Sequence, residues 1–266
     1  MNPNLTTPVT APPVVTPPTL AINRITFNQP WEWLDKGWRD LKQAHRYSLI
    51  YGGAIVCLSI LITLGLILEG LFFIVPFLAA GFYLMAPIIG LGLYQMSAHL
   101  ERGEPLQHCH ALEAWRRNHS QLAMLTAALI IIMQCWMMAN FVLFALLYTN
   151  LHPPLEQFFN TVFLSGDNYP FVFASLLVGF VLAWVAYAIS AISVPLLMDH
   201  PIDGLTAMRL SVQAVWHNLG PMTLWAGLIV LLVGIGLLTF YIGLVVALPL
   251  IGHATWHAYR DLIKQV

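Results

Sequence analysis

The stretch Ser48–Leu68, SLIYGGAIVCLSILITLGLIL, contains no charged side chain. A membrane-crossing helix needs about 20 mostly apolar residues, and in lipid the backbone of such a run must satisfy its hydrogen bonds internally, as an α-helix does. Five similar runs follow, at 71–98, 120–148, 170–198, 219–236 and 238–257. The sequence therefore predicts six transmembrane helices. A re-entrant pair is the alternative for the last two runs, although 219–257 is long enough for two crossings.

Composition supports the same class. Of the 266 residues, 59% are hydrophobic and 9% are charged, whereas a soluble domain has roughly 25% charged residues. The lipid bilayer is thus the expected partner. A formal net charge of −1 argues against nucleic-acid binding, which needs clustered basic surface. The three cysteines are an odd number and imply no disulfide framework.

The first 30 residues differ from the rest. They contain seven prolines among Thr, Asn and Val and lack a continuous apolar segment. This composition predicts a disordered tail over 1–30 and a helical membrane domain over 31–266.

The basic residues predict the orientation. With six spans, all eleven Lys and Arg residues fall on one side, and the opposite loops near 69–70, 149–169 and 235–237 contain none. Because basic loops stay in the cytoplasm, we expect both termini to be cytoplasmic.

Two amphipathic segments indicate an internal repeat. Apolar residues recur at i, i+3, i+7 and i+10 before the first span (Trp31, Leu34, Trp38, Leu41) and before the fifth (Leu205, Met208, Val212, Val215). We predict three units, at about 31–100, 101–200 and 201–262, each an amphipathic cytoplasmic helix followed by a two-span hairpin. Such helices lie in the headgroup plane; the alternative is a docking surface for a partner. Five tryptophans are expected at the membrane interface: Trp31, Trp38, Trp115, Trp216 and Trp256.

A second repeat signal lies in the helices that return to the cytoplasm. Pro87 and Gly90 have the same spacing as Pro249 and Gly252. Proline bends a helix and glycine admits a close neighbour, so we predict equivalent packing roles, with chance as the alternative. Two amides inside the third span, Gln134 and Asn140, are expected to bridge helices rather than to bind substrate.

Four segments carry a family resemblance: Gly37–Leu41 (GWRDL), Leu100–Pro105 (LERGEP), Pro195–Asp199 (PLLMD) and, above all, Leu248–Leu262 (LPLIGHATWHAYRDL). Over about residues 30–264 the chain resembles the bacterial integral membrane family called domain of unknown function 2189. The resemblance implies a multi-pass protein of the bacterial inner membrane. It implies no reaction, cofactor or catalytic residue.

Histidines are the candidate metal ligands. His253 and His257, at i and i+4, share one helix face, and His217 is expected at the same cytoplasmic level. Hydrogen-bonded interfacial histidines are the alternative. The cluster His108-Cys109-His110 is a weaker candidate, because adjacent helical residues point in different directions. Asp199 and Asp203 flank His200-Pro201, and Asp203 is the expected N-cap of the helix that follows.

No phosphate loop, nucleophile elbow or pair of intramembrane carboxylates is present in the sequence. We therefore expect a non-enzymatic protein without a cofactor, acting as an accessory or assembly factor for another membrane complex. The first alternative is a small-molecule or lipid permease with a cavity between the repeats. The second is a membrane metal or redox protein that uses His253 and His257.

Overall fold

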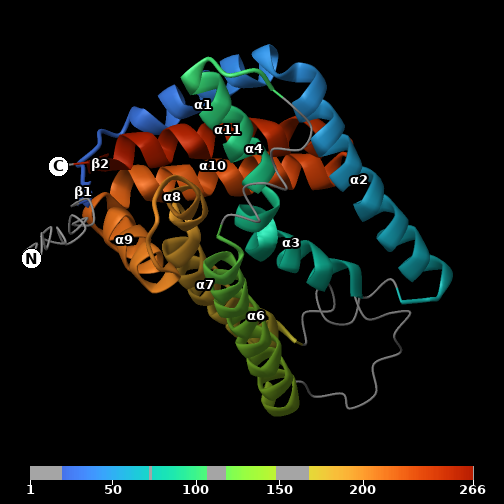
Figure 1. Cartoon of the computed structure of the whole chain (residues 1–266). Coiled ribbons are helices and arrows are strands. Elements are labelled where there is room, and N and C mark those ends of the chain that lie inside the picture. The colour runs from blue at the N-terminus through green and yellow to red at the C-terminus, as the bar shows by residue number, and fades with distance from the viewer. Residues whose placement is uncertain (1–19, 72–73, 107–117, 148–167, 266) are drawn as a thin grey trace, which may run out of the picture.

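The computed structural model describes residues 20–71, 74–106, 118–147 and 168–265. In these segments the chain is helical apart from one two-stranded sheet (Figure 1), so the predicted all-α class is confirmed. The helices of the first third are α1 (Gln29–Gln43), α2 (His45–Leu68), α3 (Val75–Ile89) and α4 (Leu91–Arg102). The middle contains α6 (His119–Leu147), α7 (Tyr169–Ser190) and α8 (Ser193–Asp199). The last third contains α9 (Gly204–His217), α10 (Leu219–Leu238) and α11 (Leu244–Leu262).

Within the described segments, five helices are long and apolar enough to cross a membrane: His45–Leu68, Leu78–Arg102, His119–Leu147, Tyr169–Asp199 and Leu219–Leu238. The second and fourth continue through slight interruptions, at Gly90 between α3 and α4 and at 191–192 between α7 and α8. The sixth predicted span, 238–257, covers the turn after α10 and most of α11. α11 is not among the five, because its second half carries polar and charged side chains.

α11 lies at the centre of the described fold. It packs against α1, α2, α4 and α10, and α1, α10 and α11 run side by side in Figure 1. α6 and α7 form a separate pair that extends away from them. The core joins the two groups of helices and contains the large buried side chains Trp33, Trp225, Trp256 and Tyr259.

Close approach to α11 depends on glycine. A side chain at Gly37 of α1 would collide with the backbone of Ala254, and one at Gly52 of α2 would collide with the carbonyl of Val245 and press on the ring of Pro249. Small residues at these positions let helices approach closely.

The amphipathic stripes divide between two faces. In α1, Leu41 is buried against the core, whereas Trp31 and Trp38 are 54% and 42% exposed. In α9, the equivalent positions behave alike: Val215 is buried, whereas Leu205 and Val212 are 68% and 38% exposed. The face of α1 that packs inward is instead Trp33, Gly37, Leu41 and Ala44.

The two ends of the described chain are joined. Strand β1 (Leu20–Ile22) pairs antiparallel with β2 (Ile263–Gln265). The Asn23 amide N–H then donates to the Leu262 carbonyl at 2.9 Å, and the Ile25 N–H donates to Asn218 Oδ1 at 2.9 Å. The predicted disorder over 1–30 is therefore wrong for residues 20–30, because backbone pairing and Asn218 hold this segment in place.

Candidate functional site

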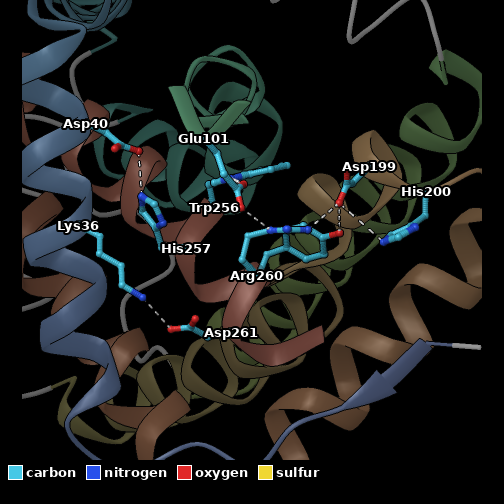
Figure 2. A network of polar contacts seen from close by, with 10 residues as sticks. Lys36, Asp40, Glu101, Asp199, His200, Trp256, His257, Arg260 and Asp261 are labelled. Carbon is cyan, nitrogen blue, oxygen red and sulfur yellow. Dashed lines mark hydrogen bonds and ion pairs between the residues drawn. The ribbon is translucent and has the colours of Figure 1, made fainter. Parts of the chain in front are cut away.

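Polar side chains on the second half of α11 contact α1, α2, α4 and α8, and Figure 2 shows the contacts with α1, α4 and α8. Residues 252–262 make three turns, so successive side chains point in all directions. His253, His257, Arg260 and Asp261 each hydrogen-bond a residue from a distant part of the chain. This polar network is the candidate site.

His253 is fully buried between two serines. Its Nε2 lies 2.8 Å from Ser48 Oγ of α2, and its Nδ1 lies 2.7 Å from Ser97 Oγ of α4. Ser97 donates its one hydroxyl proton to Asp40 Oδ2, 2.7 Å away, and therefore accepts from the imidazole. Since Ser97 has no second proton to donate, the proton of neutral His253 lies on Nδ1, and Nε2 accepts a hydrogen bond from Ser48.

Asp40 links the two histidines. Its Oδ2 also lies 2.9 Å from His257 Nε2, and both side chains are slightly exposed. The hydrogen bonds thus run from Ser48 through His253, Ser97 and Asp40 to His257. His253 and His257 do share one face of α11, as i, i+4 spacing predicts, and a carboxylate and a hydroxyl connect them.

A second part of the network joins α11 to the ends of α4 and α8. The Arg260 guanidinium donates to Glu101 Oε1 at 3.0 Å and to Asp199 Oδ2 at 3.3 Å. The Tyr259 hydroxyl donates to the same Asp199 oxygen at 2.6 Å. Burial raises the pKa of the Tyr259 phenol, and the nearby Asp199 carboxylate raises it further. Tyr259 therefore stays a hydrogen-bond donor.

The third part attaches α1. Trp33, fully buried, donates from Nε1 to Asp261 Oδ2 at 2.8 Å, and Lys36 Nζ lies 3.4 Å from the same oxygen.

Trp256 of α11 donates from Nε1 to Glu101 Oε2 of α4 at 2.9 Å. Two core tryptophans thus satisfy their N–H groups with carboxylates at the edge of the core.

The predicted metal ligands do not converge. His253 and His257 bind the serine and aspartate groups above, and His217 Nδ1 lies 2.7 Å from the Gln213 carbonyl of its own helix. In the described part of the chain, no three His, Cys, Asp or Glu side chains are grouped to hold a metal ion. The cluster His108-Cys109-His110 lies outside the described residues.

The paired Pro and Gly positions differ in their contacts. Pro87 lies in α3, two residues before that helix ends, and Gly90 separates α3 from α4. Pro249 lies inside an unbroken α11. A side chain at Gly252 would collide with Leu93 of α4, whereas one at Gly90 would meet the Tyr94 ring of its own segment. Gly252 is thus the one that admits a neighbouring helix.

Among the described residues, the two intramembrane amides of α6 do not bridge helices. Asn140 donates to the carbonyl of Trp136, four residues earlier in the same helix, at 2.8 Å, and Gln134 is exposed. Asp203 is the N-cap of α9, as predicted: its carboxylate accepts from the Thr206 N–H at 2.9 Å.

The expected interfacial tryptophans divide into two groups. Trp31, Trp38 and Trp216 are exposed. Trp256 is only 2% exposed and packs against Tyr259, so its assignment to the membrane interface is wrong. Its Nε1–H is satisfied by Glu101 instead of water. Trp115 lies outside the described residues.

Asp40, Glu101, Ser48 and Ser97 were not identified from the sequence. Nothing in the sequence around these residues distinguishes them. Asp40 and Glu101 look like ordinary surface acids at helix ends, and serines are common in membrane-spanning helices. Each lies more than 150 positions from its partner on α11, so no local pattern relates them.

These helices and their buried polar network define an α-helical, multi-pass integral membrane protein. Residues 74–199 match the model of a family described as predicted integral membrane protein (DUF2189), which confirms the resemblance over that segment. The segment Leu248–Leu262, the longest motif of the resemblance, lies beyond the matched residues. No curated protein and no solved structure matches the chain.

Proposed function

We propose that this chain is a non-enzymatic protein of the bacterial inner membrane that serves as an accessory or assembly factor for another membrane complex. The outward faces of α1 and α9 are the proposed contact surface. The observation that carries the proposal is that these two helices, matched in sequence, expose the same positions and bury the same positions.

The inward faces of both helices are occupied by the protein itself. α1 is attached to α11 through Asp40, Trp33 and the close contact at Gly37, and α9 packs against α7 and α8. The outward faces retain Trp31 and Trp38 on α1 and Trp216 on α9 as exposed aromatic side chains. Exposed tryptophans on a rigid surface are typical anchors for a protein partner.

The pairing of β1 with β2 supports six crossings. It joins residues 20–22 to residues 263–265, which requires both ends of the membrane domain to lie on one side and hence an even number of spans. α11 is the proposed sixth span: its first half is apolar, and its second half reaches the side where α1 and α9 lie. The distribution of the eleven basic residues favours the cytoplasm for that side.

In this arrangement the first and third units each consist of a lead-in helix and a two-span hairpin, and the corresponding segment of the middle unit, 107–117, lies outside the described residues. α1 precedes α2 with one residue, Ala44, between them, and α9 precedes α10 with one residue, Asn218. So short a connection keeps both lead-in helices at the membrane surface.

The polar network supports a structural role for α11 more than a metal or redox role. Both ring nitrogens of His253 are used by serine hydroxyls, and Asp40 uses His257 Nε2. A metal at this pair would have to break these bonds within the core. For the permease alternative, the groove described below lies on the outer face of one helix rather than between the repeats.

Site-specific photocross-linking in the native membrane tests the proposal. A photoreactive phenylalanine analogue would replace Trp38 or Val212 on the outward faces, and Leu61, an exposed residue of α2, would be the control. We expect discrete protein adducts from positions 38 and 212 and none of the same mass from position 61. Adducts to lipid alone at all three positions would contradict the proposal and assign both faces to the headgroup layer.

A further inference from the structure

A groove of about 700 Å³ runs along the outer face of α10. Its floor is formed by small residues, Gly220, Thr223 and Gly227, and leucines line its sides from Leu219 to Leu231. The Thr223 hydroxyl donates to the Leu219 carbonyl of the same helix at 2.6 Å. Its proton is therefore engaged within the helix, and the groove presents an almost wholly apolar surface.

The length of the groove fits one leaflet of a bilayer. The twelve steps from Leu219 to Leu231 rise by about 18 Å along the helix axis, and one leaflet contributes about half of the roughly 30 Å hydrocarbon core. α10 is one of the helices that is long and apolar enough to span a membrane. The groove therefore faces lipid, in the leaflet on the side of α9.

The residues at the start of the groove suit the head of a lipid. Phe27 lies over Gly220, where any side chain would press on the ring, and forms the roof of the groove. Arg24, three residues earlier, is exposed, and its neighbour Ile25 is bonded to Asn218 at the beginning of α10. A guanidinium at this end complements a phosphate above an acyl chain.

We propose that this groove binds one acyl chain of an anionic phospholipid from that leaflet, with Arg24 beside the headgroup. Three properties of the groove indicate this occupant: its floor is apolar, its length matches one leaflet, and a basic residue lies at one end. A second copy of the chain packed on α10 is the competing occupant, and the experiment separates the two.

Two open glycines provide a matched pair of variants. A side chain at Gly227, in the groove, meets nothing within 4 Å, and the same holds for Gly65 on α2. Gly227→Phe therefore introduces a ring into the groove from a Cβ position that meets no neighbour, and Gly65→Phe adds the same ring to another exposed span. Both purified proteins would be examined by native mass spectrometry in mild detergent with added palmitoyl-oleoyl phosphatidylglycerol.

We expect the lipid-bound fraction to fall by roughly tenfold in Gly227→Phe and to stay at the wild-type level in Gly65→Phe. The new ring excludes about two methylenes of the acyl chain from the groove, which lowers the binding affinity by about that factor. Phe27→Ala, which removes the roof and leaves α10 intact, should also reduce it. Equal binding in all variants, or equal loss in both glycine variants, would overturn the proposal. Loss of a dimer mass in Gly227→Phe with unchanged lipid binding would overturn it in favour of the second copy.

Discussion

Two neighbouring glycines in α2 have opposite surroundings. Gly52 faces the carbonyl of Val245 and the ring of Pro249, whereas Gly53 faces open space. Since α11 must lie against α2 here, the first glycine is required by packing and the second is free to vary.

Leucine substitutions should separate the two. Gly52→Leu and Gly252→Leu should each lower the thermal stability in detergent, because overpacking costs about 1–3 kcal/mol, while Gly53→Leu should change it little. Thermal unfolding of the purified variants measures this. Equal tolerance of all three would show that α11 is not closely held.

The hydroxyl of Ser97 joins the buried His253 to the partly buried Asp40. Ser97→Ala should destabilise the protein by about 1–3 kcal/mol, because His253 Nδ1 and Asp40 each lose a hydrogen bond in the core. Ser59→Ala is the control, since the Ser59 hydroxyl donates to the Ile55 carbonyl of its own helix. A similar loss in both variants would mean that the network adds nothing beyond ordinary serine burial.

The stability of helix α9 depends on its N-cap, Asp203. The Thr206 hydroxyl and N–H hold the pKa of Asp203 below its ordinary value of 3.8. The folded pKa is thus below the unfolded pKa, so the stabilisation is complete above about pH 4 and is lost as the pH falls through the folded value.

Substitution of the cap tests this. Asp203→Asn retains a cap but removes the titration, so its stability at neutral pH should be close to that of the wild type and its acid-dependent loss should be smaller. Asp203→Ala should be less stable at neutral pH. The measurement is the unfolding temperature between pH 3 and pH 7; an unchanged acid dependence in Asp203→Asn would contradict the assignment.

The sequence predicted some elements closely and others only in part. The run 48–68 agrees with α2, His45–Leu68, because a lipid-exposed helix is specified by its own hydropathy. The run 238–257 is displaced relative to α11, Leu244–Leu262. The apolar turn residues before α11 resemble a span, and the helix continues past His257 because Arg260 and Asp261 find partners in α8, α4 and α1. Those contacts are long-range, so hydropathy alone could not indicate them.

At the scale of the whole molecule, the joined ends determine the topology. Reporter fusions after Val266 and within 101–118 should lie on the same, cytoplasmic side, and a fusion within 150–168 should lie on the other. An external C-terminus would contradict the predicted orientation, and a C-terminus on the opposite side from residues 101–118 would contradict the six-span arrangement.

The central position of α11 has a consequence for biosynthesis. α11 leaves the ribosome after every other helix, yet Trp33, Asp40, Ser48 and Ser97, from the first hundred residues, depend on it for their partners. Until α11 has been synthesised, Trp33 and Ser48 lack their partners on it and α1 cannot dock against it, although Ser97 and Asp40 can already bond each other. We therefore expect a chain that stops before residue 244 to be more sensitive to proteolysis, because α1 then has no α11 to dock against.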